Sequence, residues 1–172
     1  MEPDLRREHI LAAIKNSLKP VSASVLAKEL NVSRQVIVGD VALLRAQGHE
    51  IIATARGYMI PNFTDTSQYL GKIVCQHMPA DTKDELYIMV DMQAIVVNVI
   101  VEHGFYGEIT GVLNLAIRAD VDIFIEKVEK AEVRLLSELT MGIHIHTVAC
   151  RNKAHFEGVC EALHSKGYLY SS

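Results

Sequence analysis

The sequence has little of what marks disordered, secreted or membrane-spanning chains. Its 172 residues include no Trp, four Pro, ten Gly and three Cys, and 49% of the residues are hydrophobic. So little Pro and Gly beside so much apolar content excludes a disordered or low-complexity protein. The longest apolar run, 94–101, is interrupted by Asn98 and is far shorter than the roughly 18 residues of a membrane span. We therefore expect a soluble protein with one ordinary domain or two small ones.

The cysteines and the N-terminus predict a cytoplasmic location. Cys75, Cys150 and Cys160 are odd in number and form no C-x-x-C pair, so we predict free thiols in a reducing compartment. The chain begins Met1-Glu2-Pro3-Asp4, and an amphipathic pattern follows instead of an apolar signal core. No secretory segment is predicted.

Charge is distributed unevenly along the chain. The formal net charge is -4, which by itself argues against binding to nucleic acid. However, residues 1–62 contain eight basic and six acidic side chains, about +2, whereas residues 63–172 contain nine and fifteen, about -6. The stretch 61–67 is polar and contains Pro61, as is typical of a linker. We predict a weakly basic domain over 1–62 and an acidic domain over 63–172.

The first half has the pattern of a winged helix-turn-helix. Apolar residues recur at helical spacing as far as Lys19-Pro20, and Ser22 and Ser33 can cap two further short helices. Gly48 stands where a helix C-terminal glycine is expected. Two short strands are predicted at 51–53 and 58–60, around a glycine-containing turn that makes a wing.

The third predicted helix offers hydrogen-bond donors where a reading helix needs them. Its early side chains would face base edges in the major groove, where Arg and Gln pair with guanine and adenine. Later basic residues would contact phosphates. The side chains predicted to contact DNA are Ser33, Arg34, Gln35, Val38, Arg45 and Arg56. A capped three-helix cluster also fits a protein-interaction module. Gly39, in the middle of the third helix, either lets another group approach the helix backbone closely or is merely tolerated.

The second half predicts a compact α+β domain with a mostly antiparallel sheet. Strands are expected over 70–77, 85–90, 94–102, 106–115 and 143–150. A helix should run from Asp120 to about residue 136, and a last helix should begin at Asn152 and end at Gly167.

The main chemical signal is His144-x-His146 on the strand 143–150. Alternate strand residues share a face, so both imidazoles would point the same way, about 7 Å apart. That separation suits two ligands of one metal ion, although paired surface histidines also occur by chance. By the same alternation, Ile143 and Ile145 would face the core on the other side.

Two further residues would complete a metal site. His77 closes the first predicted strand, and Glu85 opens the next. Three imidazoles and one carboxylate fit Zn, Ni, Co or Fe(II) and disfavour Mg or Ca. Cys75 shares strand parity with His77, and Cys150 shares it with His146. These thiols would either approach the metal or be inert and buried.

A second candidate site is the glycine-flanked aromatic loop 102–107. Its side chains His103, Phe105 and Tyr106 would line a small-molecule pocket or would simply pack against one another in a turn. The remaining histidines are predicted to be structural or surface residues; they are His9, His49, His155 and His164.

Together these motifs resemble the niacin-responsive transcriptional repressors of the NiaR type. The first-half motifs are S-R-Q-V-I-V from Ser33, then Asp40, A-L-L-R over 42–45, I-I-A-T over 51–54 and R-G-Y over 56–58. The second half resembles the 3H domain of that family, named for its histidines. That likeness is carried by His77, by 101–103 with 106–109, and by 144–147.

The resemblance implies a DNA-binding repressor of genes for NAD biosynthesis or niacin salvage and transport. It implies nicotinic acid as the co-repressor and a homodimer that binds operator DNA. It also implies a divalent transition metal, nickel or zinc, held by His77, Glu85, His144 and His146. Gly39 departs from the longer polar residue expected in the reading helix and leaves the operator sequence open.

Two other classes of function remain open from the residues alone. A metal centre of this kind with an open position could activate water, as in a metal-dependent hydrolase. Against that alternative, the sequence shows no convincing nucleophile and base pair. The second half could also be a metal-stapled dimerisation module without an effector.

Overall fold

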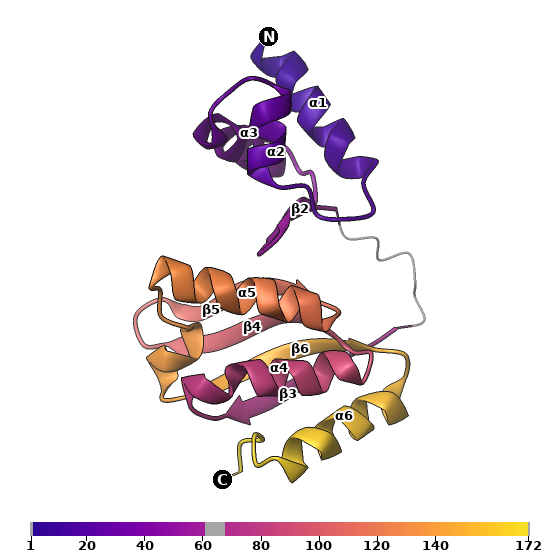
Figure 1. Ribbon diagram of the computed structural model, residues 1–172, viewed down its shortest axis with the longest axis vertical. Helices are drawn as coiled ribbons and strands as arrows, with labels where there is room; N and C mark the ends of the chain where they lie inside the picture. Colours follow the sequence, from indigo (N-terminus) through magenta and orange to yellow (C-terminus); the bar gives the residue numbers. More distant parts are fainter. Residues whose placement is uncertain (1, 61–67, 172) are drawn as a thin grey trace. The chain divides into compact units, whose positions relative to one another are not determined.

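The protein divides into two compact units. The computed structural model describes residues 2–60 and 68–171, and internal contacts separate Met1–Thr64 from Asp65–Ser172 (Figure 1). The boundary predicted at residue 62 lies outside the described residues. No helix among the described residues is long and apolar enough to cross a membrane.

The first unit is a cluster of three helices with a two-stranded hairpin. Its elements are α1 (Pro3–Lys15), α2 (Ala23–Glu29), α3 (Arg34–Ala46), β1 (Ile52–Thr54) and β2 (Gly57–Met59). The Ser22 and Ser33 side chains accept hydrogen bonds from the backbone at the start of α2 and α3, as their cap positions predicted. Gly48 follows α3 with a φ of +95°. The helix α1 ends at Lys15, earlier than predicted.

The second unit is an α+β domain, which confirms the predicted fold class. Its elements are β3 (Tyr69–Gln76), η1 (Pro79–Asp81), α4 (Thr82–Asp91), β4 (Ile95–His103), β5 (Gly107–Leu115), α5 (Arg118–Ala131), η2 (Leu136–Thr140), β6 (Ile143–Cys150) and α6 (Lys153–Ser165). The four strands form one antiparallel sheet in the order β3-β6-β4-β5.

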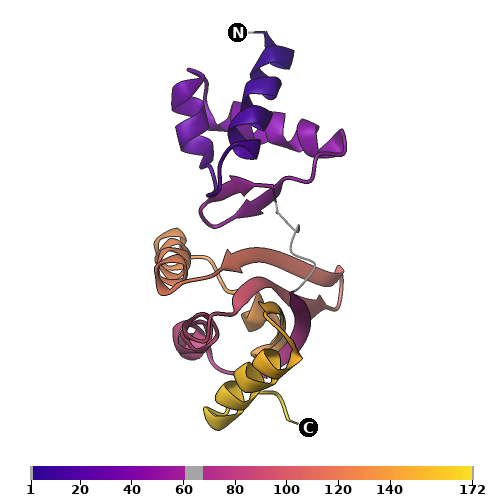
Figure 2. The ribbon, with the colours of Figure 1, turned by 90° about the vertical axis from the view of Figure 1, so that its right-hand side faces the viewer.

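The helices of the second unit cover one face of this sheet. Figures 1 and 2 show α4 and α5 side by side, and α6 contacts β3, β6 and α4. The core beneath them includes Met89, Val96, Val148 and Leu163, all buried. On the opposite face, alternate side chains of β3 are exposed, among them Leu70 and Val74. The sheet therefore has one covered and one open face.

The strand predicted over 85–90 is wrong, because these residues belong to the helix α4. Its buried side chains Glu85, Leu86, Met89 and Val90 recur at helical spacing. The short apolar run was ambiguous between strand and helix. Acidic residues in the first turn, Glu85 among them, also favour a helix start.

The helix predicted from Asp120 is displaced and too long. It begins at Arg118, because the Asp120 carboxylate accepts hydrogen bonds from the backbone of Ala116 and Ile117 just before the helix. It ends at Ala131, where Glu132 takes the left-handed conformation with φ +52°. The segment beyond it is the separate short helix η2.

Candidate metal centre and DNA-binding helix

The candidate metal residues of the second unit come from two strands and one helix. In the antiparallel pair β3 and β6, Cys75 lies opposite His144 and Ile73 lies opposite His146. His77 directly follows β3, and Glu85 lies in the first turn of α4. The fold thus brings together four predicted ligands, His77, Glu85, His144 and His146.

The strand prediction placed these histidines on the wrong face of β6. His144 and His146 are each 3% exposed and point toward the helices, whereas Ile143 and Ile145 are half-buried on the other face. Alternation was predicted correctly, but it does not say which face is covered. The imidazoles therefore lie inside the domain, where polar groups need partners.

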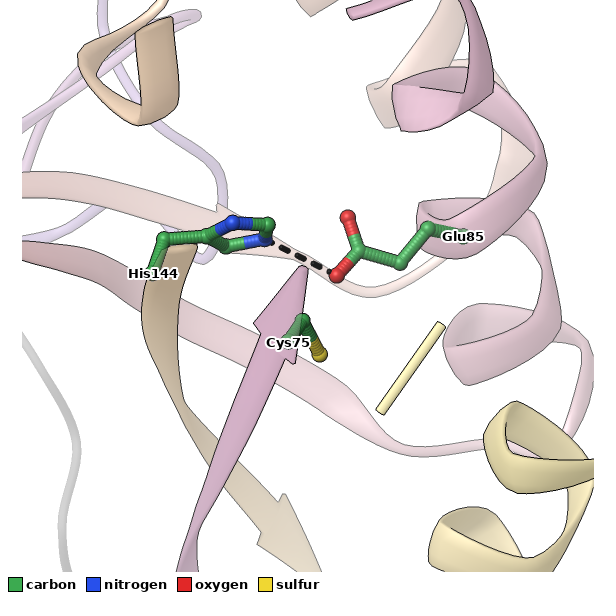
Figure 3. Close-up of side chains that lie close together, drawn as sticks. All are labelled: Cys75, Glu85 and His144. Carbon is green, nitrogen blue, oxygen red and sulfur yellow. Dashed lines mark hydrogen bonds and ion pairs between the residues drawn. The ribbon is translucent and has the colours of Figure 1, made fainter. Parts of the chain in front are cut away.

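The Glu85 carboxylate is the centre of the cluster. It is fully buried, and its Oε1 lies 3.0 Å from His144 Nε2 and 3.4 Å from His146 Nε2. Its Oε2 lies 2.7 Å from His77 Nε2. Figure 3 shows Glu85 reaching from α4 toward His144 on β6, with Cys75 beside them.

Backbone carbonyls determine which nitrogen of each imidazole carries a hydrogen. Nδ1 of His77 lies 2.9 Å from the Met78 carbonyl, and Nδ1 of His144 lies 2.8 Å from that of Gly142. Nδ1 of His146 lies 2.8 Å from the carbonyl of Asn98. Carbonyls only accept, so all three Nδ1 atoms donate. In each neutral ring, the Nε2 lone pair then faces the carboxylate.

That arrangement fits a metal ion. Two lone-pair nitrogens, His77 Nε2 and His146 Nε2, and the Glu85 Oε2 are buried without a hydrogen bond among the described residues. Lone pairs and a carboxylate repel one another unless a cation or added protons lie between them. Metal-bound histidines characteristically donate their other nitrogen to a backbone carbonyl or carboxylate. The donor set of nitrogen and oxygen atoms suits a divalent transition metal.

Without a metal, protons would take the place of the cation. Burial disfavours the charged forms of His77 and His146, but the nearby Glu85 carboxylate outweighs burial and raises the pKa of both. Burial likewise opposes ionisation of Glu85, but the three imidazoles lower its pKa well below the usual value. Protonation of the imidazoles and ionisation of Glu85 therefore depend strongly on one another.

Two backbone features position the imidazoles. Gly142 has a φ of +88°, and a Cβ there would lie 2.4 Å from the His77 carbonyl oxygen, so a side chain is excluded. The sheet is irregular between Val96 and Asn98, and the Asn98 side chain accepts a hydrogen bond from Thr147 N. At this irregularity the Asn98 carbonyl contacts His146 Nδ1, and bulges are common beside functional sites.

Cys75 belongs to the same cluster. Its sulfur, a carboxylate oxygen of Glu85 and a ring nitrogen of His144 all lie within 4.8 Å of one another. Burial, and then the Glu85 charge, raise the pKa of the Cys75 thiol. Among residues 2–60 and 68–171, these three buried side chains form a group that could hold a metal ion. Cys150, the other thiol considered from strand parity, is buried but is not part of that group.

A cavity of about 260 Å³ adjoins His144 and His146. Glu85, His144 and His146 form one wall, and most of the remaining wall is apolar, with Val99 and Phe124 among its residues. Sequence reasoning missed this cavity, because its far wall comes from the segment 133–137 between α5 and η2. Arg134 of that segment also lines the cavity and forms no ion pair within the described ranges.

The aromatic loop predicted as an effector pocket lies elsewhere, at the turn between β4 and β5. Phe105 and Tyr106 are 87% and 76% exposed, and His103 Nδ1 accepts hydrogen bonds from the backbone of both. The rings of His103 and Tyr106 pack at 5.3 Å. None of the three residues lines the cavity beside the histidines. Their role in ligand binding stays a prediction.

The first unit presents the predicted DNA-contacting residues on and around α3. Ser33, Arg34, Gln35 and Arg45 are exposed, and Val38 is half-buried. Arg56 lies in the turn between β1 and β2. An exposed Arg and Gln at the start of a capped helix suit major-groove contacts. Their contacts with DNA stay predictions.

A partly buried ion pair joins α3 to α1, a role that sequence reasoning did not assign. Asp40 on α3 is 4% exposed, and its carboxylate accepts from Arg6 Nε at 2.6 Å. Arg7 adds a longer contact of 3.5 Å to the same carboxylate. The only signal was a charged residue on the apolar side of the predicted helix.

Each of the two units matches a known protein family. A family model described as "3H domain" matches residues 71–172, and one described as "HTH domain" matches residues 6–59. The chain is 37% identical over 166 residues to "Transcription repressor NadR" of Bacillus subtilis, covering 95% of this chain and 92% of that protein. It is 37% identical over 164 residues to "Probable transcription repressor NiaR" of Thermotoga maritima, covering 95% and 93%. The first relative is thus named as a transcription repressor and the second as a probable one.

Proposed function

Because the chain belongs to the family of NadR- and NiaR-like transcription repressors, we propose that it represses genes of NAD biosynthesis or niacin salvage and transport. In this proposal it acts in the cytoplasm, α3 binds operator DNA, and nicotinic acid is the co-repressor. One observation carries the proposed sensor role. Three imidazoles, each oriented by a backbone carbonyl at Nδ1, converge on Glu85 beside a cavity of about 260 Å³. The names of these relatives argue against the alternative of a metal-dependent hydrolase.

The metal in this proposal is nickel or zinc, and its ligands are His77, Glu85, His144 and His146. When bound, it would place a divalent cation beside the cavity wall. The three Nδ1 contacts to carbonyls hold the rings with Nε2 pointing inward, so the ligands are oriented before the metal binds.

The size and chemistry of the cavity support nicotinic acid as its ligand. A cavity of about 150 Å³ accommodates one benzene ring, so about 260 Å³ suffices for one ring with a carboxylate and is too small for a dinucleotide. Apolar residues such as Val99 and Phe124 would pack against the ring. Arg134 would pair with the carboxylate, as guanidinium groups do.

We also propose that the repressor is a homodimer whose subunits meet at the open face of the sheet. Leu70 and Val74 expose 57% and 41% of their surface there. Lys72 lies between them on the same face. Glu102 on β4 and Glu108 on β5 lie directly opposite each other and form a repulsive like-charge pair. Two-fold symmetry lets each Lys72 approach the acidic pair of the other copy, which supports self-association.

Binding of nicotinic acid would favour one arrangement of the two DNA-binding units. A ligand shifts such an equilibrium only by its different affinities for the two states. Coupling of about 1–3 kcal/mol, typical of allosteric proteins, changes DNA affinity by roughly 5-fold to 150-fold.

The experiment uses duplex DNA selected from a random library by the full-length, metal-loaded protein. Fluorescence anisotropy then measures its affinity with nicotinic acid, and with nicotinamide as the uncharged control. We expect at least fivefold tighter binding with nicotinic acid only, and loss of this response in Arg134→Ala but not in Arg151→Ala, an exposed control outside the cavity. DNA affinity indifferent to nicotinic acid would favour the effector-free dimerisation module.

The dimer is tested by analytical ultracentrifugation of Val74→Asp. A carboxylate on the open face should yield monomers, because burying an unpaired charge in the subunit contact is unfavourable. Lys72→Glu should weaken the dimer, and adding Glu102→Lys to Lys72→Glu should restore it. A Val74→Asp protein that stays dimeric would place the contact elsewhere.

A further inference from the structure

The sulfur of Cys75 lies beside Glu85 and His144, two of the four proposed metal ligands, and is not itself one of the four. Cys75 is 0% exposed and lies opposite His144 in the pair of β3 with β6. Its sulfur is within 4.8 Å of ligand atoms of both Glu85 and His144, and Figure 3 shows the three side chains grouped at the end of β3. From this geometry we propose that Cys75 is a fifth ligand of the metal and binds it as a thiolate.

Charge balance supports this assignment, which rests on the metal part of the proposed function. Three neutral imidazoles and one carboxylate around a divalent ion leave a net charge of +1. The ligands lie in the interior, where side-chain exposures are 0–4%, and an uncompensated buried charge is unfavourable. A thiolate brings the net charge to zero. On binding, the Cys75 S–H bond breaks, a sulfur–metal bond forms, and the proton is released to solvent.

The thiolate would also narrow the choice of metal and change how an anionic effector is held. Thiolate ligands favour Zn²⁺, Co²⁺ or Ni²⁺ over Mn²⁺ and Mg²⁺. With the metal charge balanced by Glu85 and Cys75, the carboxylate of the effector would rely mainly on Arg134 at the cavity wall.

Cobalt titration of the full-length protein tests this role. Metal-stripped protein is titrated with Co²⁺ while the sulfur-to-cobalt charge-transfer band in the near ultraviolet and the ligand-field bands in the visible are recorded. We expect both sets of bands in the wild type and in the control Cys150→Ser. In Cys75→Ser, the charge-transfer band should vanish, the visible bands should persist, and Co²⁺ affinity should fall at least about tenfold.

The other outcomes separate the possible failures. Stoichiometric Co²⁺ binding with visible bands and no charge-transfer band in the wild type would overturn the role of Cys75 and leave the metal site intact. Absence of Co²⁺ binding would overturn both. If Cys75→Ser does not fold, as judged by circular dichroism, X-ray absorption of the zinc-loaded wild type decides. A sulfur shell at about 2.3 Å supports the proposal, and nitrogen and oxygen alone overturn it.

Discussion

The two units place their functional side chains at opposite extremes of burial. In the first unit, Arg34 and Gln35 are exposed on α3, and the core of the unit consists of apolar residues. In the second, Glu85, His144 and His146 are in the core itself, each at most 3% exposed. Substitutions on the proposed DNA-contacting surface can therefore leave the fold unchanged, whereas a metal held by the proposed buried ligands would contribute to folding as well as to binding.

The largest effect is expected from loss of the metal, which should lower the stability of the second unit and leave that of the first unchanged. Glu85→Ala should lower nickel or zinc affinity at least 100-fold, because it removes the carboxylate that all three imidazoles face. Calorimetry of the wild type with a chelator should show a lower melting temperature for the second unit only. Glu138→Ala, an exposed control outside the ligand cluster, should retain its metal. Equal destabilisation of both units by the chelator would break the comparison.

The DNA-reading unit should show the reverse pattern. Arg34→Ala should weaken binding to the selected operator by about 1–3 kcal/mol and relax its sequence preference, because a bidentate base contact is lost. Arg45→Ala should weaken binding to all sequences and reduce the salt dependence by about one ion. Metal content should be unchanged in both variants, as atomic emission can verify. Unaltered sequence preference in Arg34→Ala would remove that residue from base reading.

Stability of the metal-free protein should depend on pH in a direction opposite to that of the metal-loaded protein. The raised pKa values of His77 and His146 mean that their contribution is full below the unfolded value of about 6.5 and is lost as the pH rises through the folded values. The lowered pKa of Glu85 means that its contribution is full above the unfolded value of about 4.3 and is lost progressively as the pH falls below that value. With metal bound, acid instead protonates the ligands and destabilises the protein.

Urea unfolding between about pH 6 and pH 8.5 measures this reversal. The metal-free protein should lose stability toward the alkaline end, and the slope should shrink in His77→Gln. The matched control is His164→Gln, at an exposed position on α6. Parallel slopes with and without metal would contradict the coupling through Glu85.

The smallest effect concerns Gly39 on α3. A Cβ at this position would meet nothing within 4 Å, so Gly39→Ala should stabilise the first unit by up to roughly 1 kcal/mol through helix propensity. Gly39 is one turn from Gln35 and shares its face, so the added methyl group should reduce operator affinity. Thermal melting and anisotropy on the same protein distinguish a glycine needed for close approach of DNA from one that is merely tolerated.

Local signals explain which parts of the fold were predictable. Ser22, Ser33 and Gly48 act within one helical turn of their own positions, and their capping roles were predicted correctly. Glu85 was placed on a strand, because a short apolar run does not distinguish a buried helix from a strand. The histidines of β6 were assigned to the wrong face, because only the packing of α4, α5 and α6 decides which face is covered.

The sequence by itself determined the order of the two units, the capped reading helix and the histidine pair on one strand, because spacing and capping are local properties of the chain. Only the tertiary structure brought Glu85 to His144 across 59 positions and set Cys75 opposite it. Likewise, only packing brought Arg134 to the wall of the cavity beside Glu85. Those arrangements depend on strand register, helix placement and backbone carbonyl positions, which arise when distant segments pack together.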